Sequence, residues 1–96
     1  VAWHATDGRG EGNSNSIGIE IVESGDREKT LENAIILAAI ILKEHDLGTS
    51  ALRTHHHWYA KKTDDCPRIL LEKEYRKLEE HTWKWFVEAV GKLLGE

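Results

Sequence analysis

Three consecutive histidines and one cysteine are the residues of this chain best suited to chemistry. His55, His56 and His57 form a run, and Cys66 follows in the same stretch. A neutral imidazole and a thiolate are good zinc ligands, and two ligands in one segment with others elsewhere suit a catalytic site that keeps one position for water. The spacing is not that of a zinc finger, because Cys66 is the sole cysteine. A solvent-exposed histidine run with an inert core thiol is an equally weighted alternative.

Glu20 is a candidate general base. Residues 16–22 alternate, with Ile17, Ile19 and Ile21 on one face and Glu20 on the other, and such alternation predicts a β-strand. A carboxylate beside a metal-bound water can accept its proton. Judged on the residues alone, a surface glutamate on a strand is the favoured alternative.

Charged residues lie just before Cys66. Lys61 or Lys62 beside a metal site would stabilise a developing oxyanion, and Asp64 is a further oxygen donor nearby. A charged loop is more often simply a solvated loop.

Trp3 and His4 are candidates for contact with a substrate, by stacking and hydrogen bonding. The alternative is a tryptophan buried in the core and a histidine whose hydrogen bonds are made within the protein. Trp83 and Trp85 are interpreted as packing residues without a chemical role.

A long helix is predicted from about Arg27 to His45, with Asp26 as its N-cap. Apolar residues recur along it at helical spacing: Leu31, Ala34, Ile35, Ala38, Ile41 and Leu42. Three more, Ile36, Leu37 and Ile40, widen the stripe, so we expect most of the circumference to be buried.

The remaining elements complete an α/β pattern. Ala51 to Thr54 is a short strand candidate, a helix is expected to start near Pro67 or Arg68, and a last helix is expected from about Glu80 to Leu94. Its apolar stripe consists of Trp83, Phe86, Val87, Val90 and Leu94. Strand, helix, strand and helices in this order indicate an α/β fold.

Composition excludes several classes of function. The chain has 96 residues, room for one small domain, and a net charge of −4 without a basic run, which weighs against nucleic-acid binding. The longest apolar run, Ala34 to Leu42, is far shorter than the roughly 20 residues of a membrane span. The glycines of residues 8–12 precede a predicted strand instead of following one, so a phosphate-binding loop is rejected.

Four motifs, in order and spacing, resemble the amidase-2 family, which includes phage endolysins and bacterial autolysins and is related to the peptidoglycan recognition proteins. They are Ala2-Trp3-His4-Ala5, Asn15-Ser16-Ile17-Gly18-Ile19-Glu20-Ile21, Thr54-His55 with Trp58, and Cys66-Pro67-Arg68. The resemblance covers nearly the whole chain.

The resemblance implies a central mixed sheet flanked by helices, and one zinc held by two histidines and a cysteine or aspartate. It implies hydrolysis of the amide between N-acetylmuramic acid and L-alanine in peptidoglycan. His55 matches the second histidine ligand, Cys66 the third ligand, and Glu20 the glutamate that activates water. A loop lysine, Lys62 or Lys61, matches the residue that steadies the tetrahedral intermediate.

The chain departs from the family between His55 and Cys66. The usual loop is shorter and has a lysine where Asp64 stands here. Counted forward from His55 and Trp58, Lys61 aligns with the family's lysine. Lys62-Thr63-Asp64 instead fits the Lys-Thr-Asp sequence of relatives that use aspartate as a zinc ligand. Asp64 is therefore the reserve ligand.

The family's first zinc histidine lies on a strand before the Trp-His motif, and neither that strand nor the helix after it matches any part of this chain. We therefore expect residues 1–96 to be the C-terminal two-thirds of a single zinc amidase catalytic domain, incomplete at the N-terminus. His4, His56 or His57 could take the third ligand position, although none matches the motif. Alone, the chain should be a poor amidase that associates with itself or with the missing N-terminal segment.

The expected function is zinc-dependent lysis of the bacterial cell wall by a secreted or phage-released enzyme. Peptidoglycan is the expected partner, with neither nucleic acid nor a membrane span involved. One alternative is a non-catalytic peptidoglycan-binding module of the same fold. Another, from outside this fold, is a metal-storage or sensor module built on the histidine run.

Overall fold

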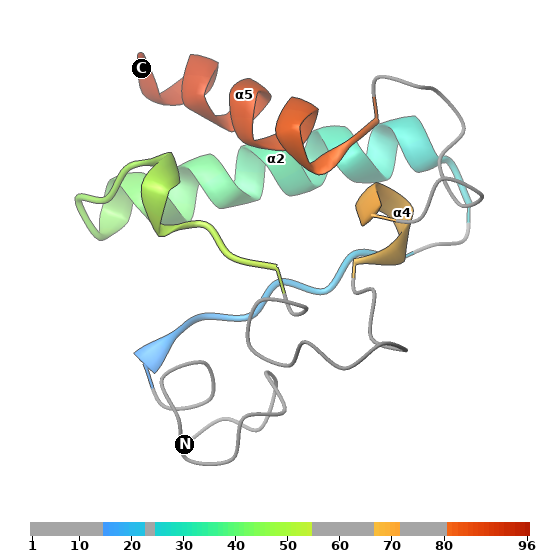
Figure 1. Ribbon diagram of the computed structural model, residues 1–96, viewed down its shortest axis with the longest axis horizontal. Coiled ribbons are helices and arrows are strands. Elements are labelled where there is room, and N and C mark those ends of the chain that lie inside the picture. Colours follow the sequence, from blue (N-terminus) through green and yellow to red (C-terminus); the bar gives the residue numbers. More distant parts are fainter. Residues whose placement is uncertain (1–14, 23–24, 55–66, 72–80) are drawn as a thin grey trace.

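Two helices packed against each other form the centre of the molecule. The computed structural model describes residues 15–22, 25–54, 67–71 and 81–96. In Figure 1, α5 (Trp83–Leu94) lies along α2 (Arg27–Glu44), and both the short α4 (Arg68–Leu71) and the 3-10 helix η1 (Thr49–Ala51) contact α5.

The ends of α2 follow from its own residues. The Asp26 side chain accepts a hydrogen bond from the Lys29 backbone N–H at 3.1 Å, which satisfies one of the unpaired donors of the first turn. Glu28 in the first turn and Lys43 in the last complement the helix dipole. The predicted N-cap is confirmed, and the helix begins at Arg27 as predicted and ends one residue before His45.

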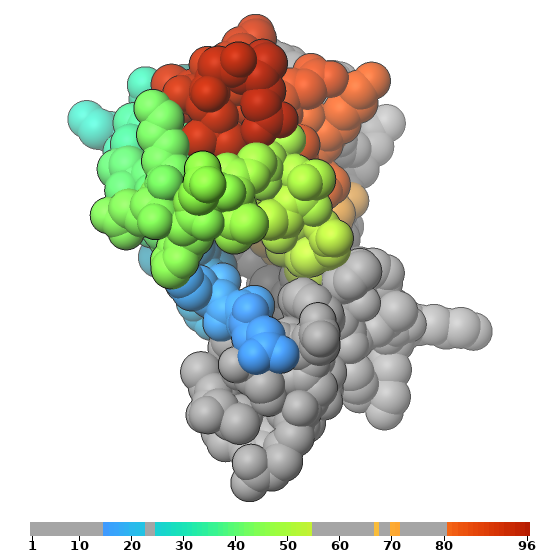
Figure 2. Space-filling view, turned by 90° about the vertical axis from the view of Figure 1, so that its left-hand side faces the viewer, coloured from blue at the N-terminus to red at the C-terminus, as the bar shows by residue number. Residues whose placement is uncertain are grey.

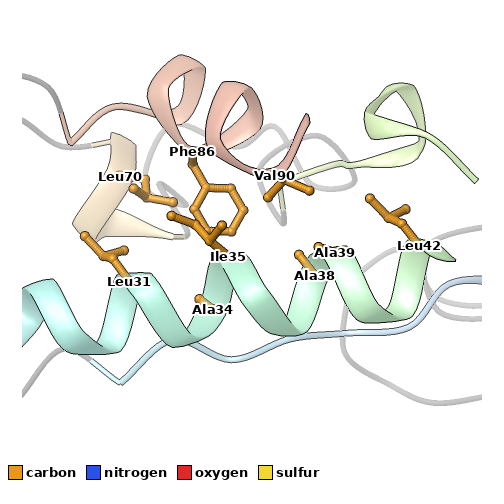
Figure 3. Close-up of a cluster of buried hydrophobic side chains, with 9 residues drawn as sticks. All are labelled: Leu31, Ala34, Ile35, Ala38, Ala39, Leu42, Leu70, Phe86 and Val90. Carbon is orange, nitrogen blue, oxygen red and sulfur yellow. The ribbon is translucent and has the colours of Figure 1, made fainter. Parts of the chain in front are cut away.

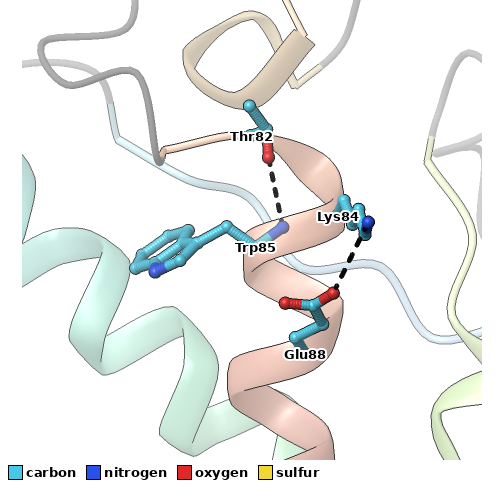
Figure 4. Close-up of polar contacts among 4 residues, drawn as sticks. All are labelled: Thr82, Lys84, Trp85 and Glu88. Atoms are coloured by element: carbon cyan, nitrogen blue, oxygen red, sulfur yellow. Dashed lines mark hydrogen bonds and ion pairs between the residues drawn. The ribbon is translucent and has the colours of Figure 1, made fainter.

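The start of α5 is set by Thr82, whose hydroxyl accepts from the Trp85 backbone N–H at 3.1 Å (Figure 4). This cap places the first helical residue at Trp83, later than the predicted start near Glu80. Gly95 ends the helix in the left-handed conformation, with φ of 81°. The exposed Lys84–Glu88 pair, 4.0 Å apart, contributes little.

The core fills the space between the helices, as Figure 3 shows. Leu31, Leu70 and Val90 are the most completely buried large side chains. Trp83 and Trp85 pack against this core, and the Trp83 ring stacks on Phe86 with centroids 5.5 Å apart. The prediction that both tryptophans serve packing is confirmed. The buried cluster consists of Leu31, Ala34, Ile35, Ala38, Ala39, Leu42, Leu70, Phe86 and Val90.

The predicted central mixed sheet of an α/β fold is wrong for this structure, because every element among the described residues is helical. Residues 16–22 carry no regular secondary structure, and Ile17 and Ile19 are 59% and 37% exposed. Residues 49–51 form η1, and 52–54 are irregular. Alternation specifies which side chains share a face, but a strand also needs a neighbour to complete its hydrogen bonds. None of the described segments provides that neighbour.

The expectation that α2 is buried around most of its circumference is also wrong. Ile36, Leu37 and Ile40 are 46%, 44% and 48% exposed. Only part of the circumference of α2 enters the core, because no described segment covers the side that carries these three residues.

The end of the chain is joined to η1 by a side chain. The Glu96 carboxylate accepts from the Thr49 backbone N–H at 2.9 Å and from the Thr49 hydroxyl at 2.7 Å. The two bonds favour the ionised carboxylate and hold the pKa of Glu96 below its ordinary value. Because the pKa is lowered on folding, this contact stabilises the fold above the unfolded-state pKa and is lost as pH falls.

We predict that Glu96→Gln lowers the thermal midpoint at about pH 7 and that its deficit is smaller at about pH 3, because lowering the pH progressively protonates the wild-type carboxylate as well. Thermal unfolding followed by circular dichroism at the two pH values measures this. Glu88→Gln, which removes an exposed carboxylate from α5, is the matched control. A deficit of the same size at both pH values would contradict the role of the charge.

Candidate active site

Glu20 lies in an irregular segment that is attached to the core by its neighbour. Ile21 is half-buried and packs against the hydrophobic cluster, whereas Glu20 is exposed. The contact of Ile21 therefore holds the segment against the core while the Glu20 side chain faces solvent.

The segment that leads to His55 is attached in the same way. Leu52 is half-buried and packs against the cluster, and the contact of Thr49 with Glu96 fixes η1 immediately before it. His55 itself lies outside the described residues.

Cys66 immediately precedes another described segment, residues 67–71. It also lies outside the described residues, and the described chain resumes at Pro67, just before α4. Leu70, in α4, is 2% exposed and belongs to the core cluster.

The described segments that contain Glu20 or adjoin His55 and Cys66 in the sequence thus pack against one core. In Figure 1 the segments 15–22 and 52–54 and α4 lie below α2, while α5 lies above it. Figure 2 shows residues 15–22 on the surface beneath α2, in agreement with the exposure of Glu20.

The other candidates fall outside the part of the chain that the structure describes. They are Trp3, His4, His56, His57, Lys61, Lys62 and Asp64. Within residues 15–22, 25–54, 67–71 and 81–96, no three histidine, cysteine or acidic side chains converge to hold a metal. The donors expected from the sequence, imidazole and thiolate, fit zinc by their chemistry.

Two features of the structure were not indicated by the sequence patterns. His81 is 6% exposed, and its ring lies 4.7 Å from that of Trp85, so it is a packing residue at the start of α5. The contact of Glu96 with Thr49 joins residues far apart in the sequence. A single polar pair at such a separation leaves no periodic signal that could reveal it.

Comparisons with known proteins place these residues in a family. The family described as Amidase_2, N-acetylmuramoyl-L-alanine amidase, matches residues 1–69. This range contains every candidate site residue, from Trp3 to Cys66. No solved structure is significantly similar to the chain, and no helix of the described residues is long and apolar enough to cross a membrane.

Three Bacillus subtilis proteins, each named as an N-acetylmuramoyl-L-alanine amidase, are similar to the chain. XlyA is 38% identical over 91 residues, which cover 93% of this chain and 27% of XlyA. CwlH is 44% identical over 73 residues, which cover 73% of this chain and 28% of CwlH. CwlA is 40% identical over 102 residues, which cover 98% of this chain and 34% of CwlA.

The chain therefore spans roughly a third or less of the length of these relatives. The family matches more than half of the chain, and the amidases are similar over most of it. On these grounds the chain belongs to the Amidase_2 family of N-acetylmuramoyl-L-alanine amidases.

Proposed function

We propose that this protein hydrolyses the amide bond between N-acetylmuramic acid and L-alanine in the peptidoglycan of bacterial walls, and that the reaction depends on zinc. Residues 1–96 would then be part of the catalytic domain. The observation that carries the proposal is the family match over residues 1–69, since all the residues expected to do the chemistry fall inside it. The names of the related amidases support the same substrate.

His55 and Cys66 would hold the metal, because imidazole and thiolate form stable bonds with zinc. Asp64 is the reserve for Cys66, and His4, His56 or His57 could add a further ligand. Bound zinc supplies a Lewis acid for the scissile carbonyl and lowers the pKa of a coordinated water towards about 7.

Glu20 is the proposed general base. Its carboxylate would take a proton from the attacking water as the water oxygen bonds to the carbonyl carbon, and would return that proton to the alanine nitrogen as the C–N bond breaks. Two observations support this role. Glu20 is exposed, and the packing of Ile21 against the core restrains the backbone beside it.

Lys62 or Lys61 would stabilise the negative charge that develops on the carbonyl oxygen. Trp3 and His4 would contact the substrate. The rival within this family is a module that binds peptidoglycan without cleaving it. Hydrolysis by the intact protein, meaning the longest natural chain that contains residues 1–96, leaves a free carboxylate on the muramic acid of the glycan and releases peptide with a free alanine amine. Detection of these products separates the two, because a binding module produces neither.

We predict that Glu20→Gln in the intact protein lowers the turnover by roughly 10²- to 10⁴-fold, the usual cost of removing a general base, while zinc stays bound. Amine release from purified peptidoglycan and metal content by atomic absorption are the measurements. Glu32→Gln, an exposed glutamate on α2, is the matched control and should keep full activity. A Glu20→Gln enzyme of near wild-type turnover would remove Glu20 from the mechanism.

We predict that Cys66→Ser loses zinc and activity together, because a hydroxyl is a poor substitute for a thiolate ligand. Zinc content is measured beside activity in Cys66→Ser and in Asp64→Asn. If zinc stays stoichiometric in Cys66→Ser and falls in Asp64→Asn, then Asp64 is the ligand and the assignment to Cys66 is wrong.

We predict that Lys62→Ala lowers turnover more than Lys61→Ala does, because Lys62 stands in the Lys-Thr-Asp context. Loss of one oxyanion donor costs on the order of 10²- to 10³-fold in turnover. Steady-state kinetics of both variants provide the comparison. Equally small effects would show that both lysines belong to a solvated loop.

A further inference from the structure

A strip of exposed apolar side chains runs along α2. Ile36, Leu37 and Ile40 form this strip, and each leaves close to half of its surface exposed. Residues three and four apart are neighbours on a helix surface, so the three side chains are contiguous.

The strip lies opposite the core side of the helix. At 100° per residue, the buried side chains of α2, among them Leu31, Ala38 and Leu42, point to one side, and Ile36 and Ile40 point roughly to the other. A helix that is apolar on two opposite sides is normally covered on both. On α2, α5 covers the core side and the strip remains exposed.

The charges beside the strip have a pattern of their own. By the same rotation, Glu32 and Lys43 flank the strip on its Ile36 side, whereas Asn33 and Glu44 lie at its two ends, in directions between those of Ile40 and Leu37. All four residues are exposed. The Ile36 flank therefore has an acid at one end and a base at the other.

We propose that the strip binds the same strip of a second copy of this chain, with the two α2 helices antiparallel. In an antiparallel pair related by a two-fold axis, like flanks face each other. With Ile36 opposite Ile40 of the second copy, Glu32 comes level with Lys43 of that copy, and each such ion pair occurs twice. At the two ends of the strip, the Asn33 amide would donate to the Glu44 carboxylate of the second copy.

The antiparallel arrangement brings opposite charges of the two copies together, whereas the parallel one leaves them without such partners. In a parallel pair, unlike flanks face each other at the same height. Glu32 and Lys43 of one copy then face Thr30 and Ile41 of the other, neither of which carries a charge to pair with them. Antiparallel helices also place their dipoles in opposition, which is favourable.

The size of the interface sets the expected strength. The 18 residues of α2 give a contact about 27 Å long, which is at the small end of specific interfaces. We therefore expect a dissociation constant on the order of micromolar. This association is independent of the proposed hydrolysis and of zinc.

The test is a charge exchange on the 96-residue chain, followed by sedimentation equilibrium over a range of concentrations. A reductant and a chelator are present, so that neither a disulfide through Cys66 nor a metal shared by histidines can join two copies. The wild-type chain should shift from 10.9 kDa to twice that mass. Glu32→Lys alone and Lys43→Glu alone should each weaken association at least about tenfold, because each places like charges opposite each other twice.

The mixture of the two single variants is the decisive measurement. Glu32→Lys presents only lysines on this flank and Lys43→Glu only glutamates, so the variants should associate with each other more tightly than either does with itself. The double variant Glu32→Lys/Lys43→Glu should recover self-association. A mixture that associates no better than its components would overturn the antiparallel arrangement.

Matched controls distinguish a change in the strip from a general effect of losing an exposed leucine or lysine. Leu37→Gln should weaken association, whereas Leu93→Gln on α5, a leucine of similar exposure at 48%, should not. Lys92→Glu removes a last-turn lysine from α5 as Lys43→Glu does from α2, and should leave association unchanged. Circular dichroism checks that each variant keeps its helices. A wild-type chain that stays at 10.9 kDa at all concentrations, or equal losses in Leu37→Gln and Leu93→Gln, would overturn the proposal.

Discussion

The contact between α2 and α5 is the interaction on which the rest of the structure depends. Phe86 and Val90 of α5 close over the buried side of α2, and Leu70 joins them from α4. Ile21 and Leu52 pack against the same cluster. A small domain has a modest core, so only a few side chains hold each of these segments in place. Glu20 and the described segments next to His55 and Cys66 in the sequence therefore depend on this contact for their positions.

The helices were predictable because their signals are local. Apolar spacing and the Asp26 cap were enough to place α2, and Pro67 marked the start of α4. The start of α5 was misplaced because Thr82, two residues beyond the predicted start, is the cap. Apolar spacing indicates which face is buried, whereas a side-chain oxygen aimed at a backbone N–H decides where the helix begins.

The predictions of a sheet and of a fully buried α2 were wrong, because both features depend on what lies beside an element. Ile17, Ile19 and Ile21 alternate as in a strand, yet only Ile21 reaches the core. For the candidate site, sequence motifs supplied the proposed residues and roles, and the structure adds the packing of Ile21, Leu52 and Leu70 on one core. This packing could not be read from spacing, because it requires contacts between segments that are distant in the sequence.

These packing contacts link the proposed chemistry to stability. A metal held by both His55 and Cys66 would close a loop between two segments that the core already fixes at Leu52 and Leu70. Loop closure costs less entropy when its ends are held near each other, so a well-packed core favours metal binding. By the same linkage, binding to the folded chain alone stabilises the fold. The packing between α2 and α5 and the proposed zinc site would therefore reinforce each other, although no residue belongs to both.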